Sequence, residues 1–390
     1  MNLVVLTKST PAHMFGGVET HAELLARAAA RLGHDVCVVT TAHPSGIAKE
    51  TWGEASVLYL DDVPAGVHSR VWWARSAAAV ARRHAQVPID LVLSLGLSGY
   101  GLAVANLPVR HYGVAYGDSM AHVISEWHDR AGVARYPRRA LGALYVGWLE
   151  RRMWRRANGV VATDKRLLGK LRRLGHRATL SYTGIDVADF VANPELRRAT
   201  RAELGIPPEA RVVLMLGTVN RQKGMWLAAE IFPALARHRP GVHLLIVGDG
   251  PDLSTIRHQL AASAAAGIAH FTGTVPLARI PAYYAASDVF FFPTLRVEGL
   301  PFAVIYALAA GLPTVAADRG GIASAIEHEI TGLLAPAGDR AALRDALARI
   351  LDDARLAVSL GKRARDRAVE QFDVDVTTAR LLEDLAPGRR

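Results

Sequence analysis

Two cations in the second half of the chain could hold a phosphate group. Arg221 and Lys223 lie in "GTVNRQKGMW", between an apolar run and a helical segment that begins near Gly224. The free N–H groups at a helix N-terminus attract an anion, and nearby cations add to that attraction. The alternative is that both are surface side chains of a loop. We expect a phosphate-binding loop here.

Glu298 is the second residue whose surroundings indicate chemistry. It lies in "FFPTLRVEGLPFAVIYALAAG", where a charged patch separates two apolar runs. We expect a central strand before it and a helix after it, so Glu298 falls where open α/β sheets bind ligands, exposed to a cleft. The amides of Gly299, Leu300 and Phe302 could hold phosphate, and the carboxylate could accept hydrogen bonds from hydroxyl groups.

Gly16 and Gly17 form a weaker candidate site. In "FGGVETHAELLARAAARLGHDV" they separate the first apolar run from the first helical segment, which would let a ligand approach the backbone closely. Glycines at such turns also occur for purely structural reasons, and the spacing is not the G-x-G-x-x-G of a dinucleotide-binding loop. Both interpretations stay open.

The elements that must position these residues indicate an α/β protein of two domains. Short runs such as "LVVLT", "DVCVVTT" and "VHLLIVGDG" alternate with amphipathic helical segments, which is typical of parallel strands covered on both faces. With 390 residues, 51% of them apolar, the chain can fill two cores. We assign residues 1–190 to the first domain and 191–373 to the second, with a terminal helix at 374–390 packing back on the first.

The formal charge of +10 is concentrated in one segment. Arginines cluster between Arg135 and Arg156, interleaved with tyrosines and tryptophans. Such a segment can lie on anionic lipid or nucleic acid, or can be a solvated helix face. No compact nucleic-acid module is visible, so we expect no nucleic-acid partner. Because no secretory signal or membrane span is recognised, we expect a cytoplasmic chain with peripheral contact to the inner face of the membrane.

Taken in order along the chain, these motifs resemble those of retaining glycosyltransferases of family 4, which have the GT-B fold. The resemblance covers essentially the whole chain and rests on "GGVETH", "TGIDVADF", "GTVNRQKG", "VGDGP", "FTGTVP", "SDVFFFPT", "EGLPFAVIYALAAGLPTVA" and "DRGGIASAIEHEITGLL". It implies two Rossmann-like domains facing a cleft. It also implies transfer of a sugar from a nucleotide diphosphate sugar, with UDP favoured over GDP, to a hydroxyl of a glycan, lipid-linked or small-molecule acceptor, as in polysaccharide biosynthesis.

The resemblance also implies roles for single residues. Lys223 matches the family's cation on the donor diphosphate, and Glu298 matches the first glutamate of a pair that holds the donor sugar. Gly16 and Gly17 match the loop over the phosphates. We therefore predict Glu298, Lys223 and Arg221 as catalytic residues. The predicted donor-binding residues are Gly16, Gly17, Thr218, Gly299, Leu300, Pro301 and Tyr306.

Three positions depart from the family pattern. Thr218 stands where the family usually has arginine, which leaves Arg221 to supply the second positive charge. Tyr306 replaces the second glutamate of the pair, so a phenol could give the ribose one hydrogen bond but not a bidentate contact. Tyr116 replaces a histidine on the acceptor side. The other acceptor-side candidates are His111, Asp118 and His122.

The implied mechanism needs no cofactor and no metal. Lys223, Arg221 and a helix N-terminus could stabilise the charge that develops on a leaving diphosphate. Asp373 and Asp375 have the D-x-D spacing of a metal site, but they open the terminal helix, where Asp373 fits better as a cap. The alternative function is a catalytically weak GT-B binding subunit that partners an active transferase, which the three departures favour.

Overall fold

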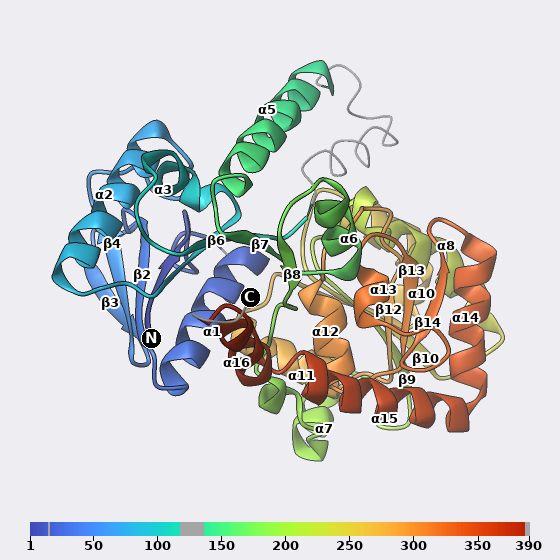
Figure 1. The fold of residues 1–390 in the computed structure, drawn as a ribbon. Helices are drawn as coiled ribbons and strands as arrows, with labels where there is room; N and C mark the ends of the chain where they lie inside the picture. Colours follow the sequence, from blue (N-terminus) through green and yellow to red (C-terminus); the bar gives the residue numbers. More distant parts are fainter. Residues whose placement is uncertain (15, 118–135, 387–390) are drawn as a thin grey trace. The chain divides into compact units, whose positions relative to one another are not determined.

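The computed structural model describes residues 1–14, 16–117 and 136–386, with residues 136–140 described by their backbone alone (Figure 1). The described chain divides into two compact units. The first unit consists of the described residues up to Asp186 and of those from Gln371 onward. The second unit is Val187–Glu370. Each unit is a sheet of mainly parallel strands with helices on its faces, which confirms the predicted α/β fold of two Rossmann-like domains.

The described part of the first unit contains an eight-stranded sheet in the order β3-β4-β2-β1-β5-β6-β7-β8. β3 pairs antiparallel with β4, and the other neighbours in this sheet are parallel. The strands are β1 (Asn2–Leu6), β2 (Asp35–Thr41), β3 (Lys49–Trp52), β4 (Ala55–Leu60), β5 (Leu91–Leu95), β6 (His111–Ala115), β7 (Gly159–Ala162) and β8 (Ala178–Leu180). The helices are α1 (Gly17–Arg31), α2 (Arg70–Gln86), α3 (Tyr100–Ala105), α5 (Tyr136–Trp154), α6 (Lys165–Arg173) and α16 (Val374–Asp384).

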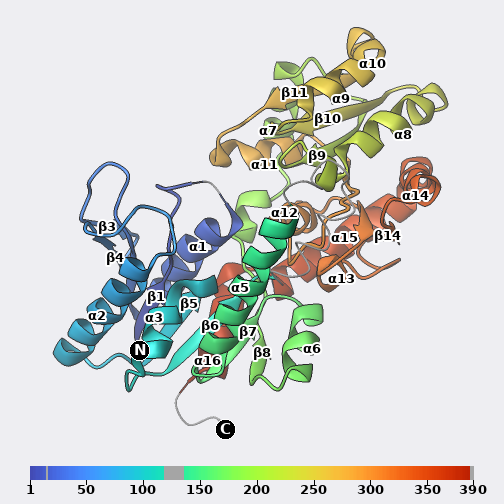
Figure 2. The ribbon, with the colours of Figure 1, turned by 90° about the horizontal axis from the view of Figure 1, so that it is seen from above.

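The central strand β1 is buried on both faces. Leu3 and Val5 point into one apolar cluster, to which α1 and α16 contribute, while Val4 and Leu6 point into a second cluster under α2 and α3. Figure 2 shows α1 and α2 on opposite sides of the strands. Successive side chains of a strand alternate between faces, so a strand covered on both sides reads as a continuous apolar run.

The terminal helix α16 belongs to the first unit, as predicted. Leu381 and Leu382 lie in the same cluster as β1 and α1, and Arg31 of α1 forms a 2.6 Å ion pair with Asp375. The Asp373 side chain accepts hydrogen bonds from the backbone N–H groups of Asp375 and Val376, at 3.0 and 3.3 Å. Asp373 therefore caps this helix, which is the simpler of its two predicted roles.

The described part of the second unit contains a six-stranded parallel sheet in the order β11-β10-β9-β12-β13-β14. The strands are β9 (Arg211–Leu216), β10 (Val242–Val247), β11 (Ala269–Gly273), β12 (Val289–Phe292), β13 (Thr314–Asp318) and β14 (Leu333–Pro336). The helices are α7 (Pro194–Glu203), α8 (Met225–Arg237), α9 (Leu253–Gln259), α10 (Ala261–Ala265), α11 (Ile280–Ala285), α12 (Phe302–Ala309), α13 (Ile322–Ala325), α14 (Arg340–Asp352) and α15 (Ala354–Gln371).

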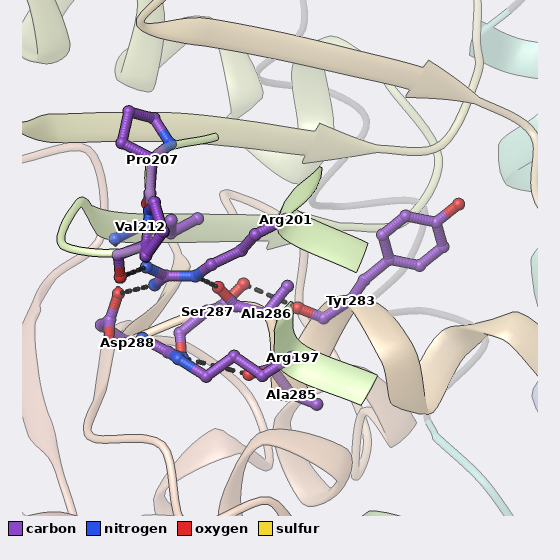
Figure 3. Close-up of polar contacts among 10 residues, drawn as sticks. Arg197, Arg201, Pro207, Val212, Tyr283, Ala285, Ala286, Ser287 and Asp288 are labelled. Atoms are coloured by element: carbon purple, nitrogen blue, oxygen red, sulfur yellow. Dashed lines mark hydrogen bonds and ion pairs between the residues drawn. The ribbon is translucent and has the colours of Figure 1, made fainter. Parts of the chain in front are cut away.

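Asp288 ties α7 to the amino ends of β9 and β12 (Figure 3). Its carboxylate accepts hydrogen bonds from Arg197 at 2.5 Å, from Arg201 at 2.7 Å, and from the backbone N–H of Val212 at 2.7 Å. Arg201 is 2% exposed and also donates to the carbonyl oxygen of Ala286 at 2.9 Å. Because the buried guanidinium is both paired and hydrogen-bonded, its burial is tolerated. The cluster fixes one end of the sheet, and the opposite end carries the candidate site.

Candidate functional site

The loops that follow β9 and β12 are hydrogen-bonded to each other at the carboxyl ends of these strands. The carbonyl oxygen of Gln222, in the 3₁₀ turn η4 (Arg221–Lys223), accepts hydrogen bonds from the backbone N–H groups of Leu295 and Arg296 at 2.8 and 3.1 Å. The hydroxyl oxygen of Thr294 also lies 3.2 Å from this carbonyl oxygen. The loop that carries Lys223 is therefore fixed against the segment that leads to Glu298.

Lys223 and Glu298 form an ion pair within this contact. The Lys223 ammonium nitrogen lies 2.7 Å from Glu298 Oε1, which also accepts a hydrogen bond from the Thr294 hydroxyl at 3.2 Å. The same ammonium lies 5.5 Å from the centre of the Phe292 ring. Glu298 is only 8% exposed, whereas the sequence predicted an exposed side chain. The carboxylate can be buried because a cation and a hydroxyl replace the water it loses.

A glycine pair after β13 holds the backbone of Glu298. Gly320 has a φ of +66°, and a Cβ at this position would lie 2.2 Å from the Glu298 carbonyl oxygen. The N–H of Gly321 donates to that oxygen at 2.8 Å. Only glycine permits both this backbone conformation and this approach. This role was not predicted from the sequence, although two glycines that closely follow a strand-like run were its signal.

Other glycines bring the loops after β9 and β10 together. A Cβ at Gly248 would lie 2.0 Å from the Gly217 carbonyl oxygen, and one at Gly250 would lie 2.3 Å from the carbonyl oxygen of Val219. Gly224 makes a similar close approach, since a Cβ at this position would lie 2.0 Å from the carbonyl oxygen of Pro293. The glycines of "VGDGP" thus let the loops at this end of the sheet approach each other closely.

The turn before α12 leaves its first N–H groups without a side-chain cap. Pro301 is the N-cap residue, and its side chain has no oxygen that could accept a hydrogen bond. Leu300 is buried, while Gly299 and Pro301 are half-buried. The backbone amides at this helix start remain suited to an anion.

Arg221 and Thr218 are both exposed. The Arg221 guanidinium lies 5.1 Å from the centre of the Trp226 ring, whose Nε1 donates to the Arg221 carbonyl oxygen at 3.1 Å. Arg221 thus lies against the first turn of α8. Its predicted role as the second positive charge stays a prediction.

Tyr306 lies in an aromatic cluster of the second unit. It is 8% exposed, and its ring stacks on Phe190 with centres 4.6 Å apart and an interplanar angle of 16°. Burial raises the pKa of the Tyr306 phenol, so the hydroxyl stays neutral. The position where the family has its second glutamate therefore holds a packed aromatic ring here. Its predicted contact with the donor stays a prediction.

In the first unit, Gly16 leaves room for Glu19 at the start of α1. A Cβ on Gly16 would lie 2.4 Å from Glu19 Oε2, and the Ser9 hydroxyl donates to Glu19 Oε1 at 2.5 Å. Gly16 is the N-cap of α1 and Gly17 its first residue. These contacts give Gly16 a structural role. Donor binding by the two glycines stays a prediction.

Tyr116 and His111 lie at opposite ends of β6. Tyr116 follows the carboxyl end, and its hydroxyl oxygen is 2.5 Å from Nδ1 of the buried His21, whose pKa burial lowers to about 4. His111 opens the strand, is 4% exposed, and has Nε2 2.7 Å from the Ser94 hydroxyl. The structure therefore does not bring these two candidates together. The other two acceptor-side candidates, Asp118 and His122, lie outside the described residues.

His21 is a residue of this region that was not predicted from the sequence. It lies in the "ETH" of α1, one turn after Gly17, and that turn was its only signal. Among the described residues, no group of three or more His, Cys, Asp or Glu side chains could hold a metal ion. No described helix is long and apolar enough to cross a membrane.

Two family models match the chain, one on each half. "Glycosyltransferase Family 4" matches residues 15–189, and "Glycosyl transferases group 1" matches residues 197–367. Sucrose-phosphate synthase from Thermosynechococcus elongatus superposes with a TM-score of 0.78 at 21% identity, covering 98% of each chain. The fold and the matches define a glycosyltransferase with the GT-B fold. The chain belongs to glycosyltransferase family 4.

Two curated relatives are similar to the chain over different lengths. A GDP-mannose-dependent alpha-(1-6)-phosphatidylinositol monomannoside mannosyltransferase of Mycobacterium tuberculosis is 32% identical over 219 residues, which cover 54% of this chain and 57% of that protein. The match thus spans little more than half of the relative. A phosphatidyl-myo-inositol mannosyltransferase of Mycobacterium leprae is 28% identical over 389 residues, covering 94% of this chain and 92% of the relative.

Proposed function

We propose that the protein is a retaining mannosyltransferase that moves mannose from GDP-mannose to a hydroxyl of a lipid-linked acceptor at the cytoplasmic face of the membrane. The observation that carries the proposal is the Lys223–Glu298 pair, held between two hydrogen-bonded loops at the carboxyl end of the sheet. The names of the relatives favour GDP-mannose over the UDP-sugar that we expected from the sequence.

In this proposal Lys223 and the amides before α12 bind the donor diphosphate. As the bond from the sugar to the diphosphate breaks, negative charge grows on the leaving oxygen, and an ammonium group and helix N–H groups stabilise it without a metal. Glu298 accepts hydrogen bonds from sugar hydroxyls. When the donor binds, the ion pair of the free protein is replaced by two contacts, one from Lys223 to the diphosphate and one from Glu298 to the sugar.

The placement of Tyr306 supports a second candidate, a catalytically weak GT-B subunit. A packed, neutral phenol stacked on Phe190 cannot replace a carboxylate that accepts two hydrogen bonds. Such a subunit would bind nucleotide weakly and would not turn it over.

A donor panel separates the two candidates. We expect GDP-mannose to raise the unfolding temperature and to be slowly hydrolysed, unaffected by a chelator, while UDP-glucose and UDP-N-acetylglucosamine do neither. A UDP-sugar that is stabilising and turned over would overturn the GDP-mannose assignment. Loss of all turnover with the chelator would overturn metal independence. A panel in which no donor is turned over would favour the catalytically weak subunit.

A further inference from the structure

An exposed apolar stripe runs along α5 in the first unit. Leu141, Leu144, Tyr145 and Trp148 are 66%, 54%, 57% and 51% exposed. Residues three, four and seven positions apart lie on the same side of a helix, so these four side chains form one stripe. Figure 1 shows α5 rising away from the strands of its unit.

The other side of α5 holds the helix to its unit. Leu149 and Met153 are 3% and 0% exposed, and Ala143 is 9% exposed. The helix packs on α3 and against β6. The exposed stripe is therefore not the face that α5 uses to pack on the unit, and burying it requires another partner.

Arginines continue the stripe at its carboxyl end. Arg151 and Arg155 are exposed, and the Arg152 guanidinium lies 5.3 Å from the centre of the Trp148 ring. Glu150, which is half-buried, is the single acidic residue in the sequence from 141 to 156. The stripe thus joins an apolar half to a positively charged half on one face.

This pattern fits an anionic lipid surface better than a protein. Leucines and aromatic rings can enter the boundary between headgroups and acyl chains, and tyrosine and tryptophan keep a polar atom at the water side. Arginines beside them reach the phosphate groups and keep their charge in the headgroup region. Charge complementarity therefore selects an anionic bilayer as the occupant.

We propose that the exposed face of α5, formed by Leu141, Leu144, Tyr145, Trp148, Arg151 and Arg152, together with Arg155 directly after the helix, binds the surface of a membrane rich in anionic phospholipid. The inference rests on the lipid-linked acceptor of the proposed function, because it explains how the chain reaches such an acceptor. Its test needs neither donor nor acceptor, so its failure leaves the outcome of the donor panel unaffected.

The test is flotation of the protein with phospholipid vesicles. We expect binding to vesicles of phosphatidylcholine with phosphatidylglycerol, weak binding to phosphatidylcholine alone, and weakening by salt. The double variant Leu144→Ser, Trp148→Ser and the triple variant Arg151→Gln, Arg152→Gln, Arg155→Gln should each lose at least about tenfold in vesicle affinity. Arg152 is half-buried and the other replaced side chains are exposed, so the variants should unfold at the same temperature as the unaltered protein.

Matched controls lie on α15, where Val358 is 73% exposed and Arg363 is exposed. Val358→Ser and Arg363→Gln should bind vesicles as the unaltered protein does. The proposal is overturned if the unaltered protein does not float with anionic vesicles, or if the α5 variants float equally well. It is also overturned if the double variant changes only the oligomeric state, since the stripe would then join copies of the chain.

Discussion

At the scale of single residues, the structure shows Lys223 and Glu298 as one unit. The ion pair at 2.7 Å, the Thr294 hydroxyl at 3.2 Å and the Gly320 turn restrict Glu298 from three sides. A site whose groups are held in place before the ligand arrives loses little free energy in reorganisation. We therefore expect small changes at Glu298 to lower turnover while the protein still folds.

Replacing Glu298 by glutamine tests this expectation. Glu298→Gln keeps the shape of the side chain but removes the charge, so donor turnover should fall by about 100-fold or more. The loss of one charge-assisted hydrogen bond should cost about 1–3 kcal/mol in the free energy of unfolding. Steady-state turnover and urea unfolding measure the two effects. Glu370→Gln, at an exposed position of α15, is the control, and turnover by Glu298→Gln within twofold of the unaltered protein would contradict the role of Glu298.

The sequence predicted Lys223 and Glu298 because both follow apolar runs that end in a loop. It could not predict Thr294, Gly320 or His21, because their roles depend on contacts between segments far apart in the sequence. Gly320 meets Glu298 only after β12 and β13 pair, and His21 meets Tyr116 only after α1 packs on its sheet. The predicted exposure of Glu298 was wrong. Glu298 is buried because it pairs with Lys223, and the sequence around a charged loop residue does not show which residue it pairs with.

At the scale of elements, Asp288 explains how α7 is fixed to the second sheet. One carboxylate joins Arg197, Arg201 and the backbone of Val212. Arg201 is nearly inaccessible, with 3% of its side chain exposed. Removing the only carboxylate in this group leaves a buried cation without its charge partner.

Asp288→Asn should therefore lower the free energy of unfolding by about 3 kcal/mol. Denaturant unfolding followed by circular dichroism measures this loss. Asp352→Asn removes a carboxylate that is 55% exposed and pairs with Arg239, and it should cost at most about 1 kcal/mol. Equal effects of the two substitutions would mean that the burial of Arg201 does not matter.

Most elements follow from local patterns in the sequence. "LVVLT" predicts β1 and "VHLLIVGDG" predicts β10, because strands buried on both faces read as short apolar runs. β3 was not predicted, since "KETW" has one buried residue and is an edge strand that pairs antiparallel with β4. Its pairing partner, not its own sequence, makes it a strand.

At the scale of the whole molecule, the two α/β units and the return of α16 to the first unit were predicted from the alternation of strands and helices. The family match on each half agrees with that plan. The first unit also contains three histidines that are shielded from solvent, the buried His21 and His111 and the half-buried His68, and only His111 was singled out from the sequence. Burial lowers the pKa of His21, His68 and His111 to about 4 each.

These histidines should make the first unit acid-sensitive. A histidine with a pKa near 6.5 when unfolded and about 4 when folded binds its proton more tightly in the unfolded chain. Stability is therefore complete above pH 6.5 and is lost as the pH falls from 6.5 toward 4, by on the order of 3 kcal/mol for each group. Denaturant unfolding at several pH values measures this slope.

The variant His111→Gln should flatten that slope, because it removes one of the three groups. His258→Gln, at an exposed position of α9, should leave it unchanged. An identical slope in His111→Gln and the unaltered protein would contradict the burial of a neutral His111.

In the proposed function, Lys223, held beside the turn before α12, stabilises a departing diphosphate. The most direct measurement is the rate of GDP release from GDP-mannose, in chelator, by the unaltered protein and by Lys223→Met. We expect measurable release by the unaltered protein and a fall of about 100-fold or more in the variant, with circular dichroism showing that the variant is folded. Equal rates for the two proteins would contradict this role of Lys223.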